Sequence, residues 1–483
     1  MILTIKDPNG TEVTELNGYN YVTVGDVSGF DITTTKGLVT LADNYEIAST
    51  GTNTQEWEVT VTFINLDTDQ NDNTGKSFSA NLIIQDSEYK ETLANHIISL
   101  YTKDGDNNLY YHDGVGDYEY SHVEAGDNSY RYSGGLVFSQ KAIDAGYLGM
   151  YNSPALNGVD IKGHELIKSY CDGEYSVRAC SAETSMVETY TTAYDETVHY
   201  TSYNDAKKQA LKDGYLEDEV ENYVCFGSDT TPCPVDNLYR IIGVFDGQVK
   251  LIKVEYASSE TLGTDGAFIM PGYTDEYPSE GGADGIRYNG EPSYYKGSID
   301  YHNISIYNID SDNSAWTESK LNTVNLNTNF LNSFASKWQD KIAVHDWHVG
   351  KINCYVAFVK TIYDFELGIY ADTLTNSAKI GLMYVSDYGY AASPDLWGTD
   401  MYYNFDRVVN DDRLWIHGGL AEWTITTNSR SRVLYVSPSG NVDINGDSPS
   451  LYANALRPCF YLNEDVEFSG GTGTQSDPYR LVA

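Results

Sequence analysis

The chain has 483 residues, a length that predicts two or three domains, and its 41% hydrophobic content is enough for packed cores. Its 30 basic and 70 acidic residues give a formal charge of -40, and such a field repels nucleic-acid phosphates and anionic lipid surfaces. This excludes nucleic acid as the expected partner. No run of about 18 apolar residues occurs, so we expect no membrane-spanning helix.

The first 85 residues are predicted to be all β. Four short segments alternate apolar and polar residues, and Gly, Asn and Asp turns separate them. These segments are residues 19–24, 37–41, 56–64 and 78–84. Their spacing predicts a small β-sandwich that serves as a stalk.

The next segments mix helical and strand patterns. Ser87 is a candidate N-cap of a helix that carries Leu93 and Ile97 on one face. We interpret residues 86–135 and 221–483 as one α+β domain, and residues 136–220 as an insertion with helical pieces such as 204–221. The fold class predicted for the whole chain is therefore β-rich and multidomain.

Within residues 221–483, the strongest local signal is a hairpin. Strand-like residues 238–245 and 249–254 flank Asp246-Gly247, a dipeptide typical of tight β-turns. Helical spacing predicts two short helices between Trp316 and Trp338. Further strands are predicted at residues 380–385, 433–436 and 459–462.

The six cysteines indicate an oxidising compartment. Cys225 and Cys233 bracket a short polar loop, and Cys171 and Cys180 bracket another. Neither pair has zinc-ligand spacing, so two disulfides are predicted. No signal peptide is visible, and we expect an extracellular or cell-surface protein whose leader or anchor lies outside this sequence.

A search for reactive or metal-binding motifs gives only two metal hypotheses, and no cofactor is predicted. His345 and His348 could lie on one face of a helix, although hydrogen-bonded histidines explain them as well. The second metal hypothesis is a calcium site, because Asp67, Asp69 and Asn71 alternate as oxygen donors in one loop. Asx-rich turns without metal give the same pattern. No catalytic motif was found, so we predict that the chain is not an enzyme.

The last hundred residues carry a resemblance. Residues 420–425 contain Trp423, and after a polar stretch come Arg457 and Pro458 at the start of the final predicted strand. This layout resembles the C-type-lectin fold in its bacterial and phage form, as in formylglycine-generating-enzyme-like domains and the variable proteins of diversity-generating retroelements. The catalytic cysteine pair of the former and the calcium–sugar motifs of animal lectins are absent. The resemblance therefore implies a binding scaffold rather than catalysis.

Between the matched strands lies a polar and aromatic segment, residues 404–454. Its amide, hydroxyl, charged and aromatic residues resemble the output of retroelement mutagenesis, although an ordinary solvated loop has the same composition. The predicted ligand-binding residues are Asn404, Asp406, Asp411, Arg413, Trp415, His417, Asn428, Arg430, Arg432, Tyr435, Asp443, Asn445, Tyr452 and Asn454.

The functional hypothesis is an extracellular adhesin or receptor-recognition protein. A C-type-lectin-like head would display a variable surface to a protein or glycan on another cell or host. The 42 tyrosines fit such a surface, since tyrosine combines a large flat ring with a hydroxyl group. Two alternatives remain: a glycan-active hydrolase, and a structural filament or matrix subunit whose N-terminal sheet edges pair with neighbours.

Overall fold

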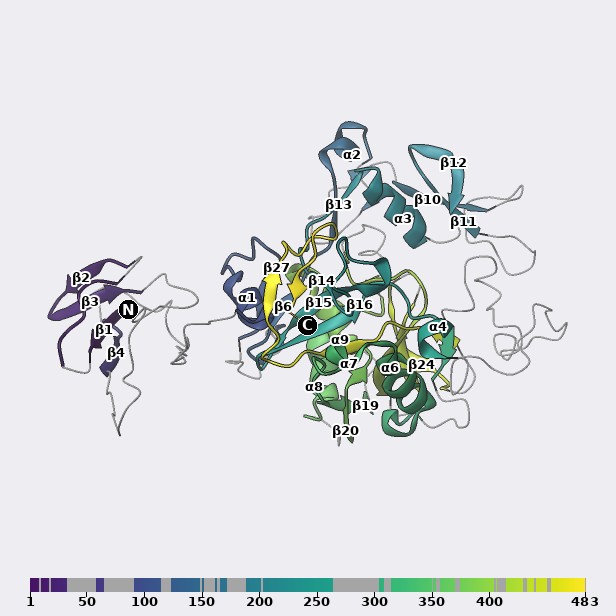
Figure 1. Ribbon diagram of the computed structural model, residues 1–483. Coiled ribbons are helices and arrows are strands. Elements are labelled where there is room, and N and C mark those ends of the chain that lie inside the picture. Colours follow the sequence, from purple (N-terminus) through teal and green to yellow (C-terminus); the bar gives the residue numbers. More distant parts are fainter. Residues whose placement is uncertain are drawn as a thin grey trace. The chain divides into compact units, whose positions relative to one another are not determined.

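The computed structural model divides the chain into two compact units, residues 1–90 and 91–483, and both are rich in β-strands (Figure 1). The residues that the structure describes are 1–7, 10–16, 19–32, 58–64, 91–113, 123–147, 150–151, 161–162, 166–171, 188–200, 203–263, 304–307, 314–349, 351–352, 357–369, 374–403, 405, 414–428, 432–437, 440–449 and 453–482. No helix among them is both long and apolar enough to cross a lipid bilayer.

Unit 1 contains an antiparallel sheet of four strands in the order β2-β3-β1-β4. These strands are β1 (Ile2–Lys6), β2 (Tyr21–Val24), β3 (Val27–Asp31) and β4 (Glu58–Thr62). Leu3 and Ile5 point to one face because strand side chains alternate, and with Phe30 they form a small core. The predicted strands at 37–41 and 78–84 lie outside the described residues. Of the predicted sandwich, the structure therefore describes one sheet.

Unit 2 is built on a seven-stranded sheet in the order β21-β26-β16-β15-β6-β5, with β14 also paired to β15. Its strands are β5 (Leu109–Tyr111), β6 (Tyr130–Tyr132), β14 (Tyr223–Cys225), β15 (Leu238–Phe245), β16 (Gln248–Lys253), β21 (Ile380–Gly381) and β26 (Cys459–Tyr461). β15 and β16 run side by side through its centre (Figure 1).

The β15–β16 hairpin confirms its turn signal. Asp246 and Gly247 have φ angles of 47° and 82°, and two successive left-handed residues are what a tight hairpin turn requires. The Cys225–Cys233 disulfide is also confirmed. Cys180, the predicted partner of Cys171, lies outside the described residues, as does Cys354, whereas Cys459 is a buried free thiol.

A second sheet carries most of the described part of the segment that was predicted to bind ligand. Its strand order is β17-β25-β22-β23-β24, and β19 (Lys351–Ile352) also pairs with β22. The strands are β17 (Ile304–Ile306), β22 (Glu422–Asn428), β23 (Val433–Val436), β24 (Val442–Asp447) and β25 (Ala453–Ala455). Every residue of β22 is buried, so β22 forms the core of this sheet.

Short helices pack between and around these sheets. They include α1 (Leu93–Ser99), α8 (Val359–Glu366) and α9 (Val385–Tyr390). The region between Trp316 and Trp338 forms more helical pieces than the two predicted: η6 (Trp316–Glu318), η7 (Leu321–Phe330), α6 (Leu331–Ser333) and α7 (Ser336–Gln339). Trp316 and Trp338 are both buried in the main core.

Residues 136–220 contain their own elements and a separate small core. β7 (Leu136–Phe138) pairs with β13 (Leu216–Asp218), which joins the two ends of this segment. Between them lie α2 (Gln140–Asp144), α3 (Tyr203–Lys212) and a three-stranded sheet of β10 (Ile167–Cys171), β11 (Glu188–Thr192) and β12 (Asp195–Tyr200).

Three secondary-structure predictions are wrong in detail. The helix predicted from Ser87 begins at Leu93, because the hydroxyl of Thr92 accepts the N–H of Asn95 and caps it. The helix predicted over 204–221 ends at Lys212, because Gly214 adopts a left-handed φ of 71° before β13 begins. The strand predicted over 380–385 stops after Gly381, and residues 385–390 form α9 instead.

Candidate functional site

The β23–β24 hairpin holds the predicted ligand-binding residues that are both described and at least partly exposed. Tyr435 and Asp443 are opposite each other in the register, and the Tyr435 hydroxyl donates to Asp443 Oδ2 at 3.0 Å. Arg432, the residue directly before β23, and Asn445, in β24, are both exposed. We call Arg432, Tyr435, Asp443 and Asn445, with the adjoining Asp447, the hairpin surface.

Backbone hydrogen bonds to side chains hold the hairpin surface in one conformation. Asp443 Oδ1 accepts the N–H groups of Asn445 at 2.8 Å and Gly446 at 3.3 Å, which fixes the turn where the β23–β24 register shifts. The Arg432 guanidinium donates to the Gly446 carbonyl oxygen at 3.1 Å. Gly446 has a φ of 63°, and a Cβ there would lie 2.7 Å from the Val433 carbonyl oxygen. The position therefore requires glycine.

Asn428 anchors the hairpin surface from behind. Its amide nitrogen donates to the carbonyl oxygens of Ile444 at 3.2 Å and Asn445 at 2.8 Å, and its Oδ1 accepts the Arg432 N–H at 3.2 Å. Asn428 is itself buried. It therefore ties β22 to both β23 and β24 rather than presenting its amide to a ligand.

Asp447 adds an unusual carboxyl group to this surface. Its pKa is raised to about 7, chiefly by burial; Asp443 acts in the same direction, and the Asn454 amide and Arg432 act in the opposite direction. The Asn454 Nδ2 lies 3.5 Å from Asp447 Oδ2. A carboxyl with this pKa gains or loses its charge near neutral pH, so it can donate or accept a hydrogen bond there.

Four of the predicted ligand-binding residues are buried in the fold instead of exposed: Trp415, His417, Asn428 and Asn454. The Trp415 indole N–H donates to the Tyr132 carbonyl oxygen at 3.3 Å, and its ring packs under the Arg240 guanidinium at 4.6 Å. Side chains that are already enclosed by their own chain cannot contact a ligand directly. The assignment of a surface role to these four is therefore corrected, because local polarity does not determine burial.

His417 is buried as a neutral imidazole. Its pKa is lowered to about 3, chiefly by burial; nearby Lys207 and Arg457 act in the same direction, and the Ser437 carbonyl opposes the shift. Its Nε2 lies 3.4 Å from that carbonyl oxygen, so the neutral ring carries its proton on Nε2. His417 therefore stabilises the main chain directly after β23, where its ring bonds the Ser437 carbonyl oxygen.

The remaining predicted ligand-binding residues cannot be placed. Asn404, Asp406, Asp411, Arg413, Arg430 and Tyr452 lie outside the described residues, as do the candidate calcium ligands Asp67, Asp69 and Asn71. Within the described residues, no group of three or more His, Cys, Asp or Glu side chains is arranged to hold a metal ion.

The helical prediction for His345 and His348 is wrong. Both lie in β18 (His345–Val349), which pairs with β20 (Leu374–Ala378). Residues three apart in a strand point to opposite faces, so the two imidazoles do not converge. His345 stacks on Tyr461 at 3.7 Å, and burial, followed by the charge of Lys250, lowers its pKa to about 4.

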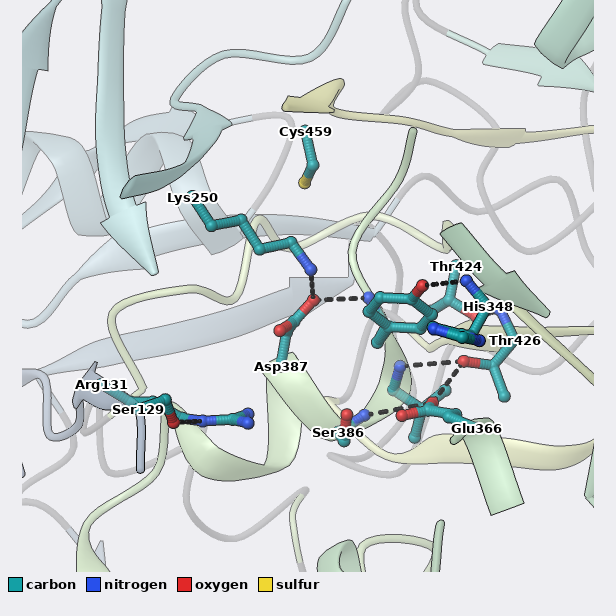
Figure 2. Close-up of polar contacts among 12 residues, drawn as sticks. Ser129, Arg131, Lys250, His348, Glu366, Ser386, Asp387, Thr424, Thr426 and Cys459 are labelled. Atoms are coloured by element: carbon teal, nitrogen blue, oxygen red, sulfur yellow. Dashed lines mark hydrogen bonds and ion pairs between the residues drawn. The ribbon is translucent and has the colours of Figure 1, made fainter. Parts of the chain in front are cut away.

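Beneath β22 lies a group of buried charged residues that sequence reasoning missed (Figure 2). Lys250 Nζ lies 2.6 Å from Asp387 Oδ2, and Arg131 is paired with Asp127 at 2.5 Å. Glu366 accepts hydrogen bonds from the Thr426 hydroxyl and the Ser386 N–H. Burial raises the pKa of Glu366 to about 7, against the effect of these hydrogen bonds.

A further buried pair joins β22 to β26 through the Arg-Pro motif. Arg457 donates to both oxygens of Glu422, each at 2.9 Å, and also to the Ile416 carbonyl. A sequence signal for such pairs is a charged residue inside a largely apolar strand, as with Lys250 in residues 249–254. These groups are enclosed by the chain itself, so their chemistry is that of a scaffold.

The hairpin surface thus offers one cation, two carboxyl groups, an amide and a tyrosine ring on a rigid sheet. An aromatic ring with flanking polar groups can stack on a planar or sugar ring and hydrogen-bond its substituents. Comparisons with protein-family models, with curated proteins and with solved structures find no match for this chain.

Proposed function

We propose that this chain is an extracellular recognition protein whose second unit is a C-type-lectin-like scaffold that binds a protein or glycan ligand through the hairpin surface. The observation that carries this proposal is the fixed conformation of Tyr435, Asp443 and Arg432 on strands anchored to the buried β22. A surface that is held in place before binding loses little conformational entropy when a ligand arrives.

The C-type-lectin-like assignment is supported by where the matched residues fall. Trp423 lies in β22 at 0% exposure, and Arg457 and Pro458 come directly before β26. The bidentate Arg457–Glu422 pair joins these two motifs. In this proposal, the residues that carry the resemblance are structural, and the polar segment beside them is the part that binds.

Binding is favoured over catalysis because three groups with displaced pKa values are enclosed. Glu366, His417 and Arg457 are all buried and cannot reach a substrate without opening the core. Catalytic acids and bases must lie within hydrogen-bond reach of the reacting atoms.

One observation favours the alternative of a glycan hydrolase. Asp443 and Asp447 lie on the same strand, and Asp443 helps to raise the pKa of Asp447 to about 7. A protonated carboxyl beside an ionised one is the pairing that glycoside hydrolysis uses. Incubation of any bound glycan with the protein, followed by chromatography, would show products only if this alternative holds.

The test is a binding screen with a matched pair of double variants. Wild-type protein is applied to a glycan array and to an array of cell-surface proteins, and the affinity for any ligand is then measured by calorimetry. Arg432→Ala with Tyr435→Ala should weaken binding about tenfold or more, since aromatic and arginine residues dominate binding surfaces.

The control variant is Tyr111→Ala with Arg480→Ala. Tyr111 is also a partly buried strand tyrosine whose hydroxyl bonds a neighbouring side chain, Asn128 at 2.7 Å, and Arg480 also donates to a main-chain carbonyl. This control should bind like the wild type. Equal affinity of wild-type protein and the hairpin double variant, with both folded, would refute the proposal.

A further inference from the structure

Lys250 and Asp387 form the most deeply buried ion pair among the described residues. Their side chains are 0% and 2% exposed, and Lys250 Nζ lies 2.6 Å from Asp387 Oδ2. Lys250 is in the central strand β16, and Asp387 is in α9, 137 residues further along the chain (Figure 2). An amine and a carboxyl group are therefore held in contact inside the core.

Aromatic rings enclose this pair. The Nζ atom lies 4.4 Å from the ring centre of Tyr384, 5.2 Å from that of Tyr461 and 5.3 Å from that of Trp347. The Asp387 Oδ2 atom also accepts the main-chain N–H of Tyr384 at 2.7 Å. The carboxyl group is thus fixed in orientation, and water is kept from both groups.

Even a paired set of charges is costly to bury in such a place. Removing an ion pair from water carries a large desolvation penalty, which mutual attraction does not always offset. Burial has this effect elsewhere in the same core, where it raises the pKa of the Glu366 carboxyl to about 7. A reaction that removes both charges would therefore be favoured here.

We propose that Lys250 and Asp387 are joined by an intramolecular amide bond. A proton passes from the Lys250 ammonium to the carboxylate, and the lone pair of the neutral amine attacks Cγ of Asp387. The new bond is Nζ–Cγ, and a second proton passes from Nζ to Oδ1. The Cγ–Oδ1 bond then breaks, that oxygen leaves with two protons as water, and Nζ keeps one hydrogen as the amide N–H. No oxidant, reductant or other reactant is needed.

The surroundings of the pair supply what this condensation requires. Fixed contact between two reacting groups replaces a bimolecular encounter, an advantage equivalent to about 10⁵–10⁸ M for well-oriented groups. The Tyr384 N–H already bonds Oδ2, and so it stabilises negative charge on that oxygen when Cγ becomes tetrahedral. Exclusion of water from the core opposes the reverse reaction, which is hydrolysis.

Such a bond would link the main sheet of unit 2 to the helix beneath β22. It would close a loop between positions 250 and 387, and cross-links that close long loops restrict the unfolded chain most. A protein of the cell surface would thereby resist unfolding without a further disulfide. The proposal is independent of which ligand the hairpin surface binds.

The test is the mass of the intact, fully reduced and denatured wild-type chain. The amide predicts a mass about 18 Da below that of the sequence, the mass of one water. Trypsin should fail to cleave after Lys250, and peptides that contain Lys250 and Asp387 should appear as one branched species. Lys253 is the internal control, because it is buried in the same strand but lies 4.0 Å from the exposed Asp236.

Two variants distinguish amide formation from any other reaction that lowers the mass of the chain. Asp387→Asn should lose ammonia, about 17 Da, and converge on the same cross-linked product as the wild type. Asp387→Ala should show the full sequence mass and normal cleavage after Lys250. A wild-type chain of unreduced mass that trypsin cleaves after Lys250 would overturn the proposal and leave Lys250 and Asp387 as an ion pair.

Discussion

The core beneath β22 and the hairpin surface use the same kinds of side chain for opposite purposes. In the core, Arg457 donates to Glu422 and to a main-chain carbonyl, and its side chain is 6% exposed. On the hairpin surface, Arg432 donates to one carbonyl and stays exposed. A polar residue whose hydrogen bonds are all satisfied by its own chain stabilises the fold, whereas one with remaining capacity can bind a partner.

The same distinction separates two aromatic residues of the predicted binding segment. Trp415 is enclosed between Arg240 and the Tyr132 carbonyl, while Tyr435 keeps part of its ring at the surface. Both were grouped as binding residues because composition cannot distinguish them. Substitutions at matched positions can therefore test the division between scaffold and surface.

The largest difference in the free energy of unfolding is expected between variants of the two arginines, Arg457 and Arg432. Arg457→Met should lower the free energy of unfolding by about 3–5 kcal/mol, because it leaves Glu422 buried without its partner. Arg432→Met should change it by less than about 0.5 kcal/mol. Urea unfolding of both variants would measure this, and similar losses for the two would show that the division is wrong.

Alanine variants of Trp415 and Tyr435 should differ almost as much in their free energy of unfolding. Trp415→Ala should lower the free energy of unfolding by about 3–5 kcal/mol, because it removes a large buried ring. Tyr435→Ala should cost about 1 kcal/mol, the size of a cross-strand contact. Thermal melts of the two variants supply the comparison, and a greater loss for Tyr435→Ala would contradict it.

A third comparison uses pH to detect a buried carboxyl group. The pKa of Glu366 is about 7 in the folded protein, against a reference value of 4.5. Its folded-state pKa is raised, so its contribution to stability is complete below pH 4.5 and is lost as the pH rises through 7. Relative to Glu366→Gln, the wild type should lose about 1.4 kcal/mol per pH unit in that window.

The measurement is the unfolding free energy of both proteins from pH 4.5 to 8. The difference between them isolates Glu366, because His345 and His417, whose pKa values are lowered, contribute equally to both. If the difference between the two unfolding free energies does not vary with pH, the pKa of Glu366 is not raised in the folded protein.

The smallest expected effect concerns Asp447, the corresponding group on the hairpin surface. Its pKa of about 7 predicts that ligand affinity changes between pH 6 and 8, by no more than about tenfold. Asp447→Asn should remove most of that change with little effect on folding. An equal pH dependence of binding in Asp447→Asn would assign the effect to another group.

Two local sequence signals predicted local features correctly. Asp246-Gly247 predicted its hairpin and Cys225–Cys233 its disulfide, since each depends on a few adjacent residues. The strand predicted over 380–385 failed because the Tyr384 N–H bonds the Asp387 carboxylate, which starts α9. Apolar periodicity does not contain that information.

Burial of polar residues could not be predicted, because the partners are distant in the sequence. Lys250 meets Asp387 across 137 residues, and Trp415 bonds Tyr132 across 283. Of these four residues, Lys250 carries a local signal, because it is a lysine inside a largely apolar strand. Arg432, Tyr435, Asp443 and Asn445 of the hairpin surface were chosen because they are polar or aromatic and lie between the strands that carry the resemblance, and their role in binding stays a prediction.

Hydrogen–deuterium exchange with and without a ligand from the arrays tests the central claim most directly. The account predicts added protection in residues 432–437 and 440–447, with no change in β16 or α9, whose amides already lie in the core. Protection confined to residues 1–90 or to 136–220, with the hairpin unchanged, would contradict the assignment of the binding surface.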